Sequence, residues 1–165
     1  MTNEVVDVAM EVETVLTSIQ RTVNKIDGRV LAEITKRTGS IAARIDETMK
    51  YLASLFAAGS LTEVQAAYSS DLILVLENMD HINSRCSEIC GFGYEIIKKK
   101  CEFSKEAEGE MKKNVTSVVE IYDKVLKYLN GEIFNNTLFS LERITHNCFN
   151  MMENDIGPLN LELVE

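Results

Sequence analysis

The chain has 165 residues, of which 45% are hydrophobic and 26% are charged, and its formal net charge at pH 7 is −9. This acidic balance argues against a surface that binds duplex nucleic acid, because such affinity comes largely from cations that neutralise phosphates. No stretch approaches the roughly 20 apolar residues that a membrane-spanning helix needs. We therefore expect a single soluble domain that does not bind nucleic acid.

Residues 1–4 (M-T-N-E) offer neither the basic flank nor the apolar run of a signal peptide. The four cysteines, Cys86, Cys90, Cys101 and Cys148, form no zinc-type C-x-x-C pair and no secreted disulfide pattern. We expect a cytoplasmic protein in which Cys86 and Cys90, one helical turn apart, are buried thiols with a packing role.

The apolar residues recur every three or four positions, and one proline and eight glycines leave few points where the chain must break, so helices are predicted almost throughout. The first helix is predicted from Val5 to Ile26, ending at Asp27-Gly28 with the glycine in a left-handed conformation. The second is predicted over residues 34–56 and ends before Gly59.

A third helix follows directly, capped by Ser60 or Thr62, and runs toward the lysines at 98–100. Residues 91–94 (G-F-G-Y) contain two poor helix formers and favour a kink in this helix. Ser104 is the predicted N-cap of a fourth helix, which ends at Asn130.

The fifth predicted helix covers about 133–155, before Pro158 forces a break. No segment alternates with the period of a strand, so the predicted fold class is all-α: an antiparallel bundle of about five long helices. The predicted domain covers residues 1–157, with a first half of about 1–100 and a shortened second half of about 101–157. Residues 158–165 are the predicted tail.

Both histidines of the chain occur in the same local sequence. Residues 76–81 read L-E-N-M-D-H and residues 141–146 read L-E-R-I-T-H, so each histidine follows a glutamate by four positions. Residues four apart are neighbours on one side of a helix, and a carboxylate beside an imidazole can hold a cation. The first pair is predicted opposite the apolar side of its helix, and the second at the border between core and solvent. The alternative interpretation of each pair is an ordinary surface glutamate and histidine.

These segments resemble the PhoU family. Residues 141–150 (L-E-R-I-T-H-N-C-F-N) are similar to its L-E-R-I-G-D-H-x-x-N-I segment. Residues 44–47 (R-I-D-E) resemble a stretch of the PhoU-like domains of bacterial sodium/phosphate cotransporters, and residues 103–107 (F-S-K-E-A) resemble the start of the family's second half. The resemblance covers roughly residues 3–153. It implies paired three-helix bundles, a cytoplasmic role in phosphate transport or its regulation, and metal bound at surface E-x-x-x-D motifs.

Both motifs depart from the family at the same place, because His81 and His146 occupy the position of its aspartate, while Asp80 and Thr145 replace its glycine. Imidazole keeps a ligand but favours a divalent or iron-type transition metal, such as iron, nickel or zinc, over magnesium or calcium. Loss of metal binding is the alternative. The predicted ligands are Glu77, His81, Glu142 and His146, with Asp46, Asp80 or Glu13 from adjacent surfaces.

The chain also departs from the family in length. Glu142 follows Glu77 by 65 residues, an interval in which the family holds one more full helix. Either the second bundle is completed by another copy of the chain, or residues 133–155 match the family's middle helix and the second echo is accidental. We expect a homodimer, and, as further partners, a phosphate transporter or sensor kinase at the cytoplasmic face of the membrane.

No nucleophile elbow, phosphate-cradling glycine loop or H-E-x-x-H motif is present in the sequence. The spacing of glutamate and histidine also differs from the inward-facing Glu-x-x-His of di-iron bundles. We therefore expect no enzymatic activity. The competing interpretation is a helical scaffold or dimerisation module with no metal and no link to phosphate, in which the acidic exterior only provides solvation.

Overall fold

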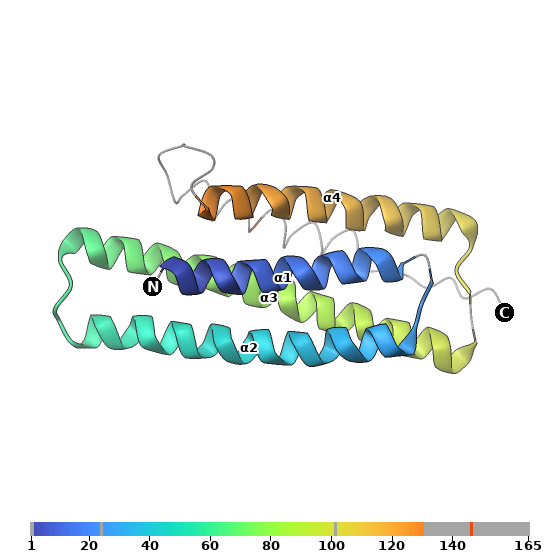
Figure 1. Ribbon diagram of the computed structural model, residues 1–165, viewed down its shortest axis with the longest axis horizontal. Helices are drawn as coiled ribbons and strands as arrows, with labels where there is room; N and C mark the ends of the chain where they lie inside the picture. The colour runs from blue at the N-terminus through green and yellow to red at the C-terminus, as the bar shows by residue number, and fades with distance from the viewer. Residues whose placement is uncertain (1, 24, 101, 131–145, 147–165) are drawn as a thin grey trace.

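A computed structural model describes residues 2–23, 25–100, 102–130 and 146, and the described part is all-α. It contains four long helices, which run alternately in opposite directions (Figure 1). They are α1 (Thr2–Thr22), α2 (Gly28–Ala57), α3 (Glu63–Lys99) and α4 (Lys105–Leu129). Within these residues no helix combines the length and the apolar character needed to span a membrane.

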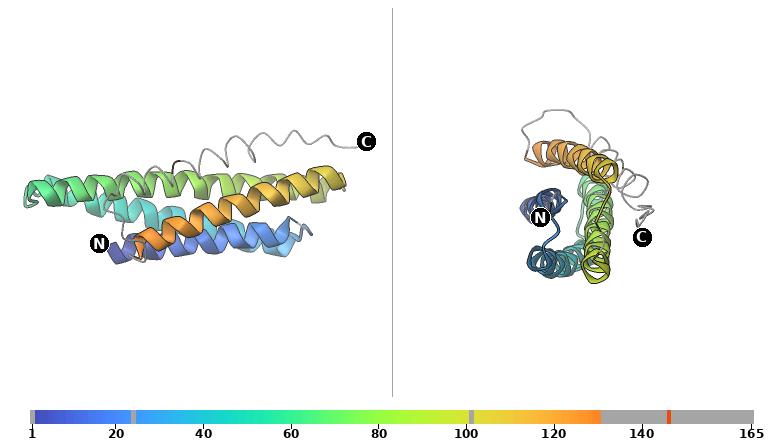
Figure 2. Two further views of the ribbon diagram at one scale, coloured as in Figure 1. Left: turned by 90° about the horizontal axis from the view of Figure 1, so that it is seen from above. Right: turned by 90° about the vertical axis from the view of Figure 1, so that its right-hand side faces the viewer.

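Helix α1 packs against all three of the other described helices, α2, α3 and α4. Helices α2 and α3 also pack against each other, so α1, α2 and α3 form a three-helix bundle. The view along the long axis in Figure 2 shows this bundle with α4 lying over it. Among the described helices, the backbone of α4 comes close to that of α1 alone.

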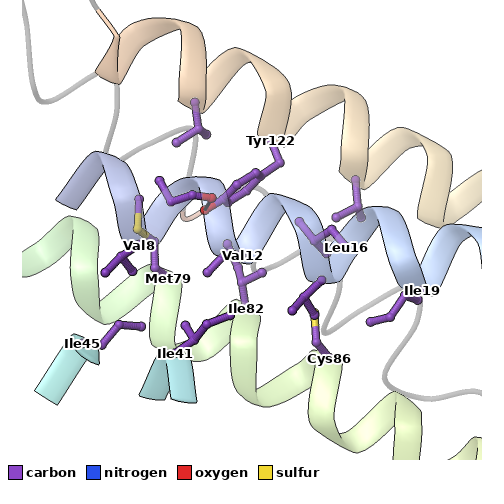
Figure 3. Packing of buried hydrophobic residues seen from close by; sticks show 14 of the residues in the cluster. Val8, Val12, Leu16, Ile19, Ile41, Ile45, Met79, Ile82, Cys86 and Tyr122 are labelled. Carbon is purple, nitrogen blue, oxygen red and sulfur yellow. Dashed lines mark hydrogen bonds between the residues drawn. The ribbon is translucent and has the colours of Figure 1, made fainter. Parts of the chain in front are cut away.

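The four helices share one continuous apolar core, part of which is drawn in Figure 3. Buried side chains come from every helix, including Val8, Val12, Leu16 and Ile19 of α1, Ile41 and Ile45 of α2, Met79, Ile82 and Cys86 of α3, and Tyr122 of α4. Complete burial of side chains of this size contributes roughly 1.5–3 kcal/mol each. The regular spacing of these residues is therefore what selects the bundle.

Two predicted helix ends are wrong, and Asp27 explains both. Helix α1 ends at Thr22, before the predicted Ile26, and α2 begins at Gly28, before the predicted residue 34. Asp27 is the N-cap of α2, and its carboxylate accepts a hydrogen bond of 2.8 Å from the backbone N–H of Arg29. An aspartate begins a helix better than it ends one. The predicted left-handed glycine at 28 is also wrong, since positive φ in the described residues occurs at Gly59 and Lys100.

The other predicted caps are confirmed. Gly59 follows the end of α2 with a φ of 61°. Thr62 begins α3 with a capping box, in which its hydroxyl accepts from the N–H of Gln65 and the Gln65 side chain accepts from the N–H of Thr62. Ser104 begins α4 by accepting a hydrogen bond from Ala107. Each cap satisfies backbone donors that the first turn leaves open.

Helix α3 continues as one helix through Gly91 and Gly93, where the sequence favours a kink. A Cβ at Gly93 would lie 2.8 Å from Cδ1 of Leu31 on α2. The glycine therefore permits a close approach of α2 and α3 within a continuous helix. At the end of α3, Lys100 adopts the left-handed conformation with a φ of 54°.

The predicted fifth helix over 133–155 and the predicted tail over 158–165 lie outside the described residues, apart from His146. That residue is helical and exposed. The predicted second half is described only as far as α4, which completes the same core as α1. The division into two halves thus stays a prediction.

Candidate functional site

Glu77 and His81 lie one turn apart on the face of α3 that points away from the core. Both side chains are exposed, whereas Leu76, Met79 and Ile82 are completely buried. The predicted exposure of this pair is therefore confirmed. A carboxylate and an imidazole at this spacing can approach one cation from the same side of a helix.

The additional metal ligands predicted beside this pair, Asp80 and Asp46, differ from it in burial and in their hydrogen bonds. Asp80 is half-buried on α3. Asp46 is exposed on α2, where its carboxylate accepts a hydrogen bond of 2.6 Å from Nζ of Lys50. This hydrogen bond raises the pKa of Lys50, so the lysine stays charged and neutralises the carboxylate that a metal would need.

Within residues 2–23, 25–100, 102–130 and 146, no group of three or more histidine, cysteine or acidic side chains could hold a metal ion. Asp46, Asp80 and Glu13 therefore do not join Glu77 and His81 in such a group. Glu142 lies outside the described residues, and its partner His146 is exposed. A metal at α3 would thus have two protein ligands from the described part of the chain, and its further ligands would come from water, another molecule or the rest of the chain.

Residues 44–47, which belong to the family resemblance, connect α2 to α1. Arg44 donates hydrogen bonds to Glu4 at 2.6 Å and to Glu11 at 2.5 Å, and Ile45 is buried in the core. The hydrogen bond to Glu4 is the largest influence on Arg44 and raises its pKa, against a smaller opposing effect of burial. The arginine and isoleucine of this segment therefore serve the packing of two helices.

A carboxylate of α1 and a carboxylate of α4 lie close enough to repel each other. Burial is the main cause that raises the pKa of the half-buried Glu13, and the negative charge of Asp123 raises it further. Asp123 in turn accepts a hydrogen bond of 2.6 Å from Nζ of Lys127. The predicted metal ligand Glu13 therefore feels the charge of α4, across more than 100 positions of sequence, and helical periodicity alone does not predict this proximity.

Cys86 and Cys90 are buried thiols, as predicted. Burial raises the pKa of Cys90, while a hydrogen bond with the Thr35 side chain acts in the opposite direction. A thiol with a raised pKa is protonated at neutral pH and is a poor nucleophile. Cys101 and Cys148 lie outside the described residues.

Comparisons with models of known protein families, with curated proteins and with solved structures found no match to this chain. The resemblance to the PhoU family thus depends on the sequence motifs alone. The function is inferred from the chain's own residues and their arrangement.

Proposed function

We propose that the chain is a PhoU-like helical module without enzymatic activity, which accompanies or regulates phosphate uptake or phosphate signalling by associating with other proteins. The sequence segments at 44–47, 103–107 and 141–150 support the family. The packing of α1, α2 and α3 as a three-helix bundle is compatible with it. The proposed partners are a second copy of the chain and a phosphate transporter or sensor kinase.

The proposed association is based on the tip of the α2–α3 hairpin. This tip extends beyond the described ends of α1 and α4 (Figure 1). Tyr51 is 56% exposed, Phe56 is 38% exposed and Val64 is 79% exposed. Phe56 lies in the last turn of α2 and Val64 in the first turn of α3. Apolar side chains that gather at an exposed tip are typical of a surface that a partner covers.

Light scattering at micromolar concentration tests self-association. We expect the parent to have the mass of a dimer and Phe56→Glu/Val64→Glu to have the mass of a monomer. Tyr94→Glu is the matched control, because Tyr94 is 39% exposed and lies near the opposite end of α3. A parent that is already a monomer would refute the proposed homodimer.

Glu77 and His81 are the proposed metal ligands on the bundle surface, for iron, nickel or zinc. Elemental analysis of untagged protein purified without chelator tests this part of the proposal. We expect metal in the parent and its loss in Glu77→Ala/His81→Ala. The control Ser84→Ala/Glu88→Ala alters another exposed pair on α3 at the same spacing and should keep the metal. Metal-free parent protein would remove the metal from the proposal and leave association intact.

Uptake of radiolabelled phosphate separates the PhoU-like role from a helical scaffold with no link to phosphate. Disruption of the gene is expected to change phosphate uptake, and the parent sequence should restore it. The variant Phe56→Glu/Val64→Glu should fail to restore it if association at the hairpin tip is required. Unchanged uptake after disruption would favour the scaffold.

A further inference from the structure

The α1–α2 and α3–α4 connections lie at the same end of the bundle, on the right in Figure 1, and residues of both connections line a cavity and a depression there. An apolar cavity of about 40 Å³ lies there. All four helices contribute to its wall, which includes Ile19, Ile34, Ile89, Phe92 and Met111. Water is a poor occupant of such a space, because a buried water needs two to four polar partners. An apolar group that enters the cavity would recover the packing contacts that its wall lacks.

A wider depression of about 460 Å³ adjoins this cavity. The two spaces share Val23, Ile26, Ile96 and Phe103 as a common wall. The volume of the depression falls within the range of roughly 300–1,000 Å³ that is typical of sites for small molecules. The two spaces together thus form an apolar cavity with a roomier entrance.

Two lysines and two glutamates line the entrance, namely Lys25, Lys100, Glu102 and Glu108. None of the four has an ion pair with another of the described residues. A simple anion at this entrance would meet the glutamates, and a simple cation would meet the lysines. A ligand that carries both charges can pair with both kinds of side chain.

We propose that this end of the bundle binds a free apolar α-amino acid. Its carboxylate lies beside Lys25 and Lys100, its ammonium group lies beside Glu102 and Glu108, and its side chain enters the apolar cavity. The apolar wall of the cavity suits an aliphatic or thioether side chain, such as that of leucine or methionine. This binding is independent of the proposed association and of the metal at α3.

An NMR chemical-shift titration of the full chain with L-leucine tests the proposal. Two analogues each remove one charge from the same skeleton: 4-methylpentanoate lacks the ammonium group and 3-methylbutylamine lacks the carboxylate. Glycine lacks the apolar side chain. We expect leucine to bind and each of the three other compounds to bind at least about tenfold more weakly, since each of the two analogues loses a charged contact and glycine loses the burial of an apolar side chain. Absence of leucine binding at millimolar concentration, or equal binding of 4-methylpentanoate, would overturn the proposal.

Three variants locate the site. Ile26→Trp places a large ring from the α1–α2 connection into the shared wall and should abolish leucine binding. Lys25→Glu/Lys100→Glu should weaken it at least about tenfold without touching the core. Lys105→Glu/Lys112→Glu is the control, with the same change of charge at exposed positions of α4 that do not line the cavity or its entrance. Circular dichroism verifies the fold of each variant, and unchanged leucine affinity in Lys25→Glu/Lys100→Glu would reject the site.

Discussion

Tyr122 links α4 to the backbone of α1 from inside the core. Its ring is completely buried in the core (Figure 3), and its hydroxyl donates a hydrogen bond of 3.1 Å to the carbonyl oxygen of Ala9. Tyr122→Phe keeps the ring and removes the donor, so we expect the free energy of unfolding to fall by about 0.5–1.5 kcal/mol. Urea denaturation followed by circular dichroism measures this change. Tyr128→Phe, at a half-buried position of the same helix, is the control, and an equal loss in both variants would contradict the assigned role of the hydroxyl.

Glu13 makes the stability of the fold depend on pH. Its pKa in the folded state is raised above the ordinary value of 4.5 by burial and by Asp123. Between these two values the folded state binds more protons than the unfolded state, so this glutamate lowers stability progressively as the pH rises through the window. At pH 7 the full cost is present, and it stays below about 1 kcal/mol because solvent screens a half-buried carboxylate.

Glu13→Gln is therefore expected to be more stable than the parent at pH 7. The advantage should shrink as the pH falls toward 4.5 and vanish well below it, as the glutamate becomes protonated in both states. Urea denaturation of both proteins between pH 4 and 8 measures the difference. Glu120→Gln changes an exposed glutamate of α4 and should show no such pH-dependent gain. A gain in Glu13→Gln that persists unchanged at pH 4 would show that the charge is not its cause.

At the scale of the helix, two glycines of α3 have opposite roles. Gly91 is exposed, and a Cβ at this position would have open space around it, whereas a Cβ at Gly93 would meet Leu31 at 2.8 Å. Gly91→Ala is expected to raise the free energy of unfolding by about 0.5–1 kcal/mol, because alanine restricts the unfolded chain and favours helix. Gly93→Ala should be less stable than Gly91→Ala by about 1 kcal/mol or more, because the buried Leu31 must move. Thermal and urea denaturation of both variants show which one has the higher free energy of unfolding. Equal values would mean that Leu31 and α2 make room for the added methyl group without loss of stability.

The helices themselves follow from the spacing of apolar residues, and the same spacing predicts the exposure of Glu77 and His81. The boundary near Asp27 was less predictable, because Val23 and Ile26 continue the apolar pattern beyond the end of α1 and line the cavity at the end of the bundle. The apolar spacing correctly predicts that these two side chains face the core. It cannot predict that the backbone at these positions is no longer helical. Asp27, the N-cap of α2, sets where the next helix begins.

Contacts between helices were beyond reach of the sequence pattern, because they depend on the relative position of two helices along their axes. Arg44 with Glu4, and Glu13 with Asp123, are pairs of this kind. The entrance formed by Lys25 and Glu108 is another, since it requires the ends of different helices to come together. A helix pattern fixes which face a residue occupies, and the register of packing then selects its neighbours.

At the scale of the whole molecule, the helices are not equally supported. The backbone of α1 comes close to those of three helices, whereas the backbone of α4 comes close to that of α1 alone within the described part of the chain. A segment with fewer packed neighbours opens at a lower free energy than the segment at the centre of the core. When α4 opens, α1, α2 and α3 stay packed against one another. When α1 opens, its contacts with α2, α3 and α4 are all lost, and the contact between α2 and α3 remains.

We therefore expect the backbone amides in the middle of α4 to exchange with solvent deuterium faster than those in the middle of α1. Hydrogen exchange followed by mass spectrometry, in increasing low concentrations of urea, measures both helices in one sample. Tyr122→Phe should accelerate exchange in α4 more than in α2, because it loosens the contact between α4 and α1 and leaves the α2–α3 contact unchanged. Equal protection of α1 and α4 at every urea concentration would instead mean that all four helices open as one cooperative unit, with the shared core of Val118, Tyr122 and Val125 binding α4 as firmly as the three-helix bundle binds itself.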